Sequence, residues 1–329
     1  MKTLSLFVLV SALSVMACSG SSTTAKEVQS IATVGGCPDG VTSSEAGNIY
    51  ITDICSGEVK KVNSDGTVTI IVPTGQIDDA DGITSVTTDA GKEILYVTQT
   101  GTDPDSGEII STDGSIKKID VDTGTVTELV DNSVITNPTG IAADSSGNIY
   151  VADQSGAVYK VPVDDAGNAG APVDLTATLP AGVTIDAPHG LTLVDNSDNS
   201  VTLYVTDQGV NNNNIIKIDV PVATEPVITE VTPPTPASAE EGKFNKPHGI
   251  GRDKNGAIFV ADENNNRVAI ITPNGNVVTF AGDNAGTAGD ESGDPNTSKL
   301  DKPRGICVDN SDAVLICDYA NAKVKKVLK

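Results

Sequence analysis

The chain has 329 residues, and its 44 acidic and 21 basic side chains give a formal net charge of −23 at pH 7. Such a surface repels phosphates, which argues against nucleic acid as a partner and against docking on anionic lipid. The sequence contains no tryptophan and only 3% aromatic residues, so it also lacks the usual stacking platforms for extended glycans.

The first residues predict export. Lys2 precedes an apolar run from Leu4 to Val15, which is too short to span a bilayer and is typical of a signal peptide over residues 1–17. The run ends in Val-Met-Ala-Cys, which looks like a lipobox and implies diacylglycerol on the Cys18 sulfur. Residues 18–27 then form a flexible tether, and the lipid is the only membrane contact. We expect an exported bacterial lipoprotein of the cell envelope, on the outer membrane at its periplasmic face or at the cell surface. The alternative is an ordinary secretory signal with an incidental cysteine.

From residue 40 onward, one short pattern recurs six times. A glycine and an apolar residue are followed 10 or 14 residues later by an aromatic or large apolar residue, and three positions further on by a polar one. The glycines are Gly40, Gly82, Gly140, Gly190, Gly249 and Gly305, and the later positions are Tyr50, Tyr96, Tyr150, Tyr204, Phe259 and Leu315. Steps of 42 to 59 residues between the glycines indicate a repeat array.

Each unit reads as a small β-sheet. Short runs rich in Val, Ile, Tyr and Thr alternate apolar with polar residues, and Gly, Asn, Asp and Pro cluster between them. The third unit predicts strands at Gly140–Ala143, Asn148–Ala152, Ala157–Val161 and Val173–Thr176. One such sheet cannot bury both faces, whereas six sheets around an axis cover each other. The sequence therefore predicts an all-β, six-bladed β-propeller with four-stranded antiparallel blades over residues 28–329.

The two ends of the chain predict how the ring closes. The sixth unit ends at Lys329 after three strands, whereas Val28–Val34 reads as an outer strand without a unit of its own. We therefore predict that the N-terminal strand completes the last blade, and we expect a monomer. The unit glycines should lie where backbones crowd at the axis. The Asp after each second strand should accept hydrogen bonds from turn N–H groups.

Two segments depart from the repeat. The second unit carries an insertion, Thr100–Thr112, and has Gln99 in place of the usual Asp. A proline-rich segment, Pro233–Glu241, separates the fourth and fifth units. Insertions of this kind often form the binding surface of a repeat protein, although solvated loops without function are commoner.

The fifth unit and the segment after it resemble a known family. Their sequences are KPHGIGRDKNGAIFVADENNNRVAII and TFAGDNAGTAGDESGDPNTSKLDKPRGICVDN. They look like the NHL repeat, a six-bladed β-propeller unit of many bacterial surface proteins, and the resemblance covers residues 28–329. Such propellers include enzymes, receptors and interaction scaffolds, so the resemblance implies the fold and leaves the function open.

Four cysteines remain after Cys18, and export permits disulfides. Cys37 and Cys55 flank the first hairpin of unit one, while Cys307 and Cys317 lie on the first two strands of unit six. We predict the bridges Cys37–Cys55 and Cys307–Cys317, although four cysteines allow three pairings. The absence of a Cys-x-x-Cys spacing argues against metal binding by these thiols.

The only two histidines stand directly before unit glycines. Around the ring, this position is occupied by Asp39, Asp81, Thr139, His189, His248 and Arg304. It lies just before the innermost strand, at the mouth of the central channel, so we expect the six side chains to converge there and bind a ligand. His189, His248 and Arg304 are the candidate catalytic residues. Arg304 could also grip a carboxylate or phosphate. Histidine would make binding pH-sensitive between about pH 5 and 8. The alternative is that these residues only cap turns and bind water.

Two imidazoles and two carboxylates form a plausible ligand set for a divalent metal, zinc or calcium: His189, His248, Asp39 and Asp81. The Pro-His contexts of both histidines are similar to those of peptidyl-hydroxyglycine amidating lyases, propellers whose zinc is held by histidines at this register. That family places three histidines on alternate blades, whereas this sequence has two on adjacent blades, and Arg304 would oppose a cation. The carboxylate and asparagine metal site of gluconolactonase-like propellers has no secure match.

Three functions remain open from the sequence. The first is a lipid-anchored propeller that binds a small molecule, peptide or protein partner at its channel mouth. The second is a metal-dependent lyase or hydrolase that acts through His189 and His248, with Asp39 or Asp81 as a further ligand or base. The third is a structural adaptor that uses blade edges and inserted loops.

Overall fold

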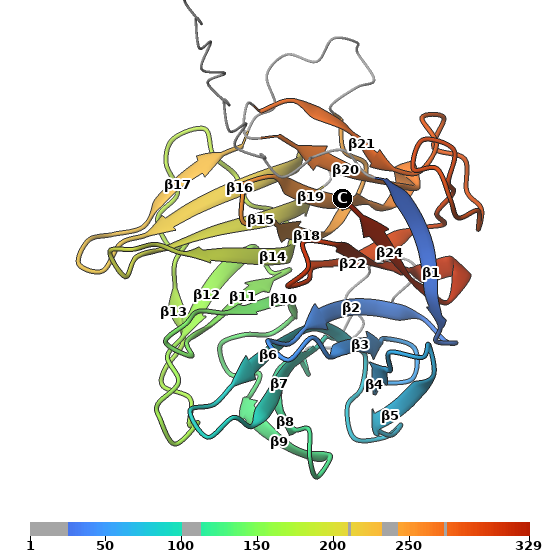
Figure 1. Cartoon of the computed structure of the whole chain (residues 1–329). Coiled ribbons are helices and arrows are strands. Elements are labelled where there is room, and N and C mark those ends of the chain that lie inside the picture. The colour runs from blue at the N-terminus through green and yellow to red at the C-terminus, as the bar shows by residue number, and fades with distance from the viewer. Residues whose placement is uncertain (1–25, 101–112, 210–211, 232–242, 273–274) are drawn as a thin grey trace, which may run out of the picture.

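The computed structural model describes residues 26–100, 113–209, 212–231, 243–272 and 275–329. These residues form six four-stranded antiparallel sheets, arranged as blades around a central axis (Figure 1). The prediction of a six-bladed β-propeller is therefore confirmed. The predicted signal peptide, Cys18 and most of the tether lie outside the described residues. So do most of the Thr100–Thr112 insertion and the whole of Pro233–Glu241.

Blades 1 to 5 run from their innermost to their outermost strand in chain order, and blade 6 does so for three strands before the N-terminal strand completes it. Blade 1 contains β2 (Pro38–Ser43), β3 (Ile49–Asp53), β4 (Glu58–Val62) and β5 (Val68–Val72); blade 2 contains β6 (Ala80–Thr87), β7 (Glu93–Gln99), β8 (Ser115–Asp120) and β9 (Thr125–Val130). Blade 3 contains β10 (Pro138–Ala143), β11 (Ile149–Asp153), β12 (Ala157–Val161) and β13 (Val173–Asp174); blade 4 contains β14 (Pro188–Asp195), β15 (Val201–Gly209), β16 (Asn212–Val220) and β17 (Val227–Glu230). Blade 5 contains β18 (Pro247–Arg252), β19 (Ile258–Asp262), β20 (Arg267–Ile271) and β21 (Val277–Ala281), and blade 6 contains β22 (Pro303–Val308), β23 (Val314–Asp318), β24 (Lys323–Leu328) and β1 (Glu27–Thr33). Two short 3₁₀ turns, η1 (Glu263–Asn265) and η2 (Tyr319–Asn321), follow β19 and β23.

The N-terminal strand closes the ring as predicted. β1 pairs antiparallel with β24, and Val28 lies opposite Val327. Both side chains are fully buried, in a cluster that also contains Phe259 and Phe280 of blade 5. Burial of apolar surface from both ends of the chain therefore holds blade 6 together.

The repeated aromatic position forms the core between blades. Tyr50, Tyr150 and Phe259 are at most 1% exposed, and each packs into a cluster that draws on two neighbouring sheets. A full blade surface is thereby covered by its neighbour, which is why no single repeat could fold alone.

The unit glycines form a ring at the axis. A Cβ atom added to Gly140 would lie 2.1 Å from the carbonyl oxygen of His189, and one added to Gly190 would lie 2.2 Å from that of His248. On the other four unit glycines, an added Cβ atom would lie 2.1–2.4 Å from the carbonyl oxygen at the equivalent position of the next blade. Only glycine lets the inner strands approach this closely, so the repeated glycine follows from the geometry of the ring.

The Asp after the second strand accepts turn N–H groups, as predicted. Asp153 accepts from Thr136 N at 2.8 Å, and Asp207 accepts from Ala187 N at 2.8 Å. In blade 2, Gln99 accepts from Asp78 N at 3.2 Å in the same way. These polar residues fix the loop that enters each blade.

One of the two predicted disulfides is present. Cys37 and Cys55 are bonded, with their Cα atoms 5.5 Å apart. The Cys307–Cys317 prediction is wrong, because both thiols are free. The β22–β23 hairpin pairs Cys307 with Leu315, so Cys317 is only a diagonal neighbour, beyond the usual reach of a bridge. The Cys317 sulfur instead lies 3.5 Å from the carbonyl oxygen of Gly40 in blade 1.

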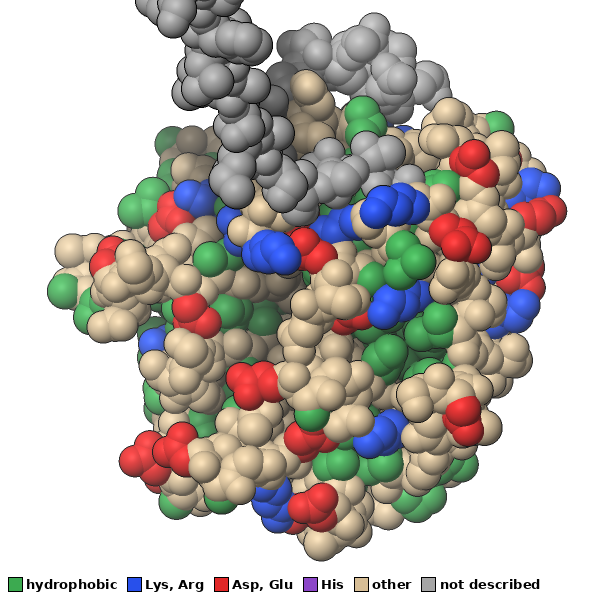
Figure 2. All heavy atoms as spheres, in the orientation of Figure 1, with side chains coloured by type: hydrophobic (Ala, Val, Ile, Leu, Met, Phe, Trp, Pro, Cys, Tyr) green, Lys and Arg blue, Asp and Glu red, His purple; other side chains and the backbone are tan. Residues whose placement is uncertain are grey.

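Acidic and basic side chains are interspersed on the face shown in Figure 2, with hydrophobic side chains between them. Several basic residues on third strands are buried against the repeated Asp. Lys60 pairs with Asp53 at 2.6 Å, and Lys325 pairs with Asp318 at 2.8 Å. Among the described residues, no helix has the length and apolar character needed to cross a membrane.

Candidate functional site

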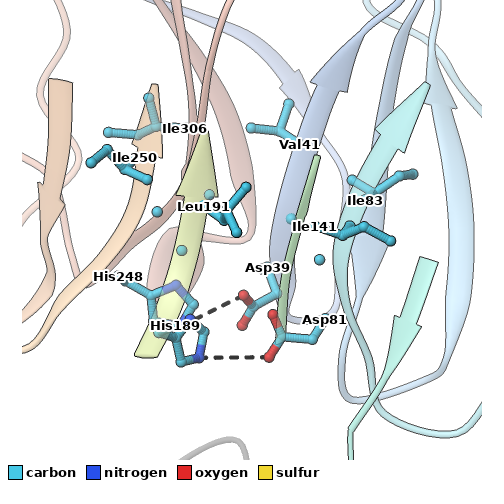
Figure 3. Close-up of a pocket in the computed structure, with 16 residues that line it drawn as sticks. Asp39, Val41, Asp81, Ile83, Ile141, His189, Leu191, His248, Ile250 and Ile306 are labelled. Carbon is cyan, nitrogen blue, oxygen red and sulfur yellow. Dashed lines mark ion pairs between the residues drawn. The ribbon is translucent and has the colours of Figure 1, made fainter. Parts of the chain in front are cut away.

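The predicted register converges at one end of the central channel. Asp39, Asp81, His189 and His248 enter it from four different blades, and their side chains point toward one another (Figure 3). Each stands one residue before the glycine of its innermost strand. The tight packing of these glycines therefore brings together side chains that are far apart in the sequence.

Beyond the polar mouth, a ring of apolar side chains lines the channel (Figure 3). The residues after the unit glycines supply it: Val41, Ile83, Ile141, Leu191, Ile250 and Ile306. The cavity volume is about 50 Å³, which is room for only a few water molecules. A ligand larger than this must rest on the mouth and insert no more than one small group.

Two histidine–aspartate couples define the mouth. His189 Nε2 lies 3.6 Å from Asp81 Oδ2, and His248 Nε2 lies 3.7 Å from Asp39 Oδ1. The imidazole rings are 3.9 Å apart between centroids and are tilted by 51°. Both N···O separations exceed hydrogen-bond length, so the polar atoms are close to each other without satisfying each other.

Arg304 lies beside the mouth rather than in it. Its Nη1 donates to Asp39 Oδ2 at 2.8 Å, and its Nη2 lies 3.5 Å from Glu263 Oε1. The guanidinium also stacks over the Tyr319 ring at 3.5 Å. Arg304 is only 2% exposed and does not belong to the channel lining. Its role here is to hold Asp39, and its guanidinium is already engaged by acidic residues of the chain.

Thr139 does not reach the channel. Its hydroxyl lies 3.2 Å from the carbonyl oxygens of both Ala152 and His189, so it bridges blades 3 and 4. In blade 4, Thr206 makes the equivalent contact with the carbonyl oxygen of His248 at 2.7 Å. Thr139 is therefore a packing residue at the inner ring.

Two charged residues at the site escaped the sequence analysis. Glu263, at the start of η1, is 1% exposed and lies between Arg304 and Lys246, whose Nζ approaches its Oε2 at 3.2 Å. The acidic pair Asp262-Glu263 directly after the second strand was the available signal. Together with Asp39, these residues form a chain of alternating charges around one side of the mouth.

Burial shifts the pKa values of the acids and of the bases at the mouth in opposite directions. It lowers the pKa of His189 and of His248 well below 6.5, so both imidazoles are neutral at pH 7. It raises the pKa of Asp81 well above 3.8, and the nearby charge of Asp39 raises it further. Burial also raises the pKa of Asp39, against the attraction of Arg304. The two histidines therefore become protonated at lower pH than the range of about pH 5 to 8 that the sequence suggests for an ordinary histidine.

The donor atoms of the mouth do not converge as a metal centre requires. In the part of the chain that the structure describes, one group of three His, Cys, Asp or Glu donors lies within 4.8 Å of one another, namely Cys37, Asp53 and Cys55. The two sulfurs of that group form the disulfide. At the mouth, the donors approach only in pairs, and the Arg304 cation lies against Asp39. This arrangement does not fit a preformed zinc or calcium site.

Asp81→Asn should stabilise the protein at neutral pH. The folded-state pKa of Asp81 is raised, so ionisation of this carboxyl opposes folding at every pH above its unfolded value. Removal of the charge should raise stability on the order of 1 kcal/mol at pH 7.5, the usual size of a single stabilising change. The gain should shrink as the pH falls and vanish at about pH 3 and below, under the unfolded-state pKa of about 3.9, where the wild-type carboxyl is protonated in both states. Thermal unfolding across this pH range measures it.

Asp65→Asn is the matched control. Hydrogen bonds from Thr67 lower the pKa of this exposed carboxyl, so its ionised form favours folding and the substitution should bring no gain at pH 7.5. Equal responses of the two variants, or a loss of stability in Asp81→Asn at neutral pH, would contradict the electrostatic description of the mouth.

Comparison with known proteins agrees with the fold. The NHL repeat profile matches residues 244–271, and a profile described as a beta-propeller repeat matches residues 126–152. The chain is therefore a six-bladed propeller with NHL-type sequence features. No curated protein matches its sequence significantly.

Solved structures with similar folds come from several bacteria. An auxiliary nutrient binding protein from Bacteroides thetaiotaomicron is 19% identical, with a TM-score of 0.64, and the alignment covers 90% of this chain and 69% of that one. A gluconolactonase from Xanthomonas campestris is 14% identical, with a TM-score of 0.64 and coverages of 91% and 88%. Virginiamycin B lyase from Staphylococcus aureus is 14% identical, with a TM-score of 0.59 and coverages of 92% and 99%. At these identities, the likeness concerns the fold alone.

Proposed function

We propose that the protein is a ligand-binding propeller that holds a small polar molecule at the mouth of its central channel. One observation carries the proposal. The side chains of Asp81, His189 and His248 meet at the mouth from three blades, yet they form no hydrogen bond within the described part of the chain. Buried polar groups in native proteins almost always have partners, so a bound molecule is the natural partner here.

The charges of the mouth favour a neutral or cationic ligand. Arg304 and Lys246 are matched by Asp39 and Glu263, which leaves the carboxyl of Asp81 as the further acidic group among the described residues that line the mouth. Each neutral imidazole offers one donor and one acceptor. Hydroxyl, amide or amino groups fit this set, whereas an anion would meet no unmatched cation among the described residues of the mouth. The fold likeness to auxiliary nutrient binding proteins supports a role in the capture of small molecules.

Export and lipid anchoring through Cys18 belong to the same proposal. The Cys37–Cys55 disulfide supports an oxidising compartment, and an anchored propeller would present its channel mouth to solutes of the cell envelope. Mass spectrometry of the N-terminal peptide from isolated envelopes tests the lipid; an unmodified Cys18 would contradict it.

An enzyme is the second candidate function. A neutral imidazole beside a carboxyl with a raised pKa is an arrangement suited to general acid–base catalysis. His189 would accept a proton from a substrate resting on the mouth, and protonated Asp81 would return one. The similar folds of a gluconolactonase and of virginiamycin B lyase favour a lactone hydrolase or a lyase.

Calorimetry at pH 7.5 with monosaccharides, aldonolactones and amino acid amides tests both candidates. We expect at least one of these classes to bind the wild-type protein. His189→Gln/His248→Gln should weaken that binding at least tenfold, because two buried hydrogen-bonding groups are altered. Binding should persist at about pH 5.5, because burial lowers the pKa of both histidines below 6.5.

Lys254→Met is the control for the double variant. Lys254 is exposed, and it forms an ion pair with Asp312, which is not a residue of the mouth. Loss of aldonolactone turnover in the double variant alone would favour the enzyme. Equal binding by all three proteins would contradict a site at the mouth. Stoichiometric zinc in the wild-type protein that is lost in the double variant would restore the metal-dependent alternative.

A further inference from the structure

A second, larger cavity lies between blades 2 and 3. It is lined by the β6–β7 turn, by Tyr96 of β7, by Lys118 of β8 and by the loops after β10 and β12. β6 begins beside Asp81 and ends at Thr87, so the cavity lies toward the face opposite the histidine mouth. Its volume is about 410 Å³, within the range of small-molecule sites. The two blades lie side by side in Figure 1.

Tyr96 places an unsatisfied hydroxyl at this cavity. The residue is only 4% exposed, and its hydroxyl makes no hydrogen bond to any residue that the structure describes. Its pKa is raised by burial alone. A largely buried phenol normally finds a polar partner, and the cavity that Tyr96 lines is where such a partner would lie.

Blades 1 and 3 show a partner that this position can take. In blade 1, the Tyr50 hydroxyl donates to the Glu93 carboxylate, and in blade 3 the Tyr150 hydroxyl donates to Asp144 Oδ2 at 3.1 Å. The same hydroxyl is thus satisfied twice by a carboxylate, once from the next blade and once from its own.

Both of these carboxylate positions are vacant around Tyr96. Glu93 stands three residues before the tyrosine of blade 2, and the corresponding residue of blade 3 is Gly147. Tyr150 pairs with Ala142, and Asp144 stands two residues after Ala142. Tyr96 pairs with Thr84, and the residue two positions after Thr84 is Val86. Gly147 and Val86 both line the cavity. The cavity beside Tyr96 therefore occupies the space that an acidic side chain fills beside Tyr50 and beside Tyr150.

Lys118 supplies a cation at the same place. It pairs with Tyr96 across β7 and β8. The equivalent Lys61 and Lys160 lie over their own tyrosine rings, at 5.7 and 5.6 Å, whereas Lys118 Nζ donates to the carbonyl oxygen of Gly167 at 3.0 Å. No carboxylate of the described residues forms an ion pair with Lys118. Tyr96 and Lys118 together offer an anion one hydroxyl donor and one charged donor.

The remaining walls define the rest of the ligand. Val86, Ile94 and Val163 give apolar surface. Of the acids at the rim, Asp164 accepts from the backbone and side chain of Asn168 within its own turn. Asp89 and Asp165 are exposed, so water and salt screen their repulsion of an anion.

We infer that this cavity is a second ligand site, which binds a small monocarboxylate with an apolar body. The carboxylate takes the place that Glu93 and Asp144 fill in the neighbouring blades and accepts hydrogen bonds from Tyr96 and Lys118. The apolar body packs against Val86, Ile94 and Val163. The site is independent of the channel mouth in its residues and in the charge of its ligand.

Calorimetric titration with sodium benzoate and sodium hexanoate, beside uncharged benzyl alcohol and hexanol, tests the inference. We expect saturable binding of at least one carboxylate and at least tenfold weaker binding of its alcohol. Tyr96→Phe and Lys118→Gln should each weaken carboxylate binding about tenfold or more, because each removes one donor. Lys160→Gln, the same change in blade 3, should leave it unaltered, as should His189→Gln/His248→Gln.

Thermal stability without ligand gives a second readout. Tyr96→Phe removes a hydroxyl that has no hydrogen-bond partner among the described residues and should not lower Tm, whereas Tyr150→Phe removes the hydrogen bond from that hydroxyl to Asp144 and should lower it. Failure of both carboxylates to saturate the folded wild-type protein up to ~10 mM would overturn the inference, since a Kd above this range is weaker than a built site requires. Equal affinity in Tyr96→Phe, Lys118→Gln and Lys160→Gln would overturn it as well.

Discussion

Gly140→Ala is expected to destabilise the propeller by about 3 kcal/mol or more, at the upper end of the cost of overpacking. The added Cβ atom would lie 2.1 Å from the carbonyl oxygen of His189 and 2.7 Å from the backbone nitrogen of Leu191. Both obstacles are backbone atoms of the next blade, so no side chain can turn aside to make room. Blades 3 and 4 would have to separate at the axis, where the whole ring is closed. Urea denaturation monitored by circular dichroism measures the loss.

Gly170→Ala is the matched control. Neither glycine has a φ in the left-handed region, and a Cβ atom on Gly170 would meet its nearest neighbour at an ordinary 3.5 Å. This variant should remain within about 0.5 kcal/mol of the wild type or gain slightly from the reduced freedom of the unfolded chain. If the two alanine variants were equally stable, close approach at the axis would not explain the repeated glycine.

The same contact explains why the fold could be predicted from the sequence. A closed ring imposes glycine at one position in every unit, and an aromatic or large apolar core position follows 10 or 14 residues later. The strands of the third unit were predicted at Gly140–Ala143 and Val173–Thr176, and they occur at Pro138–Ala143 and Val173–Asp174. The strand ends differ because turn hydrogen bonds decide them, and alternation of residue types does not encode those bonds.

The candidate site could be predicted only in part. The register before the glycine identified the four residues of the mouth, because the ring turns equivalent positions toward one axis. Thr139 was placed there as well, but blade 3 has Ala152 where blade 4 has Thr206, and Thr139 supplies the missing hydroxyl between blades. Such a replacement depends on which atoms lie within reach across two blades.

The remaining differences have the same origin. The Cys307–Cys317 prediction was wrong because the register of the β22–β23 hairpin places Leu315, and not Cys317, opposite Cys307. The cavity beside Tyr96 was not predicted, because it arises from a side chain that is absent. Comparison of each unit with its neighbours, Glu93 against Gly147 in particular, would have indicated it.

Arg304→Met should be the most damaging change outside the glycine ring. The guanidinium is 2% exposed and lies between Asp39 and Glu263. Methionine keeps much of the side-chain volume and removes the charge, which leaves Asp39 buried without its cation. Removal of one partner of a buried ion pair costs about 3–5 kcal/mol. Urea denaturation at pH 7.5 measures it.

A partner variant and a surface variant sharpen the test. Asp39→Asn in the Arg304→Met background should recover part of the loss, because the stranded charge disappears; this coupling is what a double-mutant cycle reports. Lys254→Met breaks an ion pair whose lysine side chain is 71% exposed, and it should change stability by less than about 1 kcal/mol. Equal losses of unfolding free energy in Arg304→Met and Lys254→Met would mean that the buried position of the Arg304–Asp39 ion pair does not make it more important for stability than an exposed ion pair.

The pH dependence of the loss follows from the carboxyl that is left behind. Burial already raises the pKa of Asp39, and Arg304 opposes that rise. Without Arg304, the folded-state pKa of Asp39 must rise further above its unfolded value. A carboxyl with a raised folded-state pKa favours folding when protonated and opposes it increasingly as the pH rises. Arg304→Met should therefore be closest to the wild type at low pH and furthest from it at pH 7.5, whereas a loss caused by packing alone would be the same at every pH.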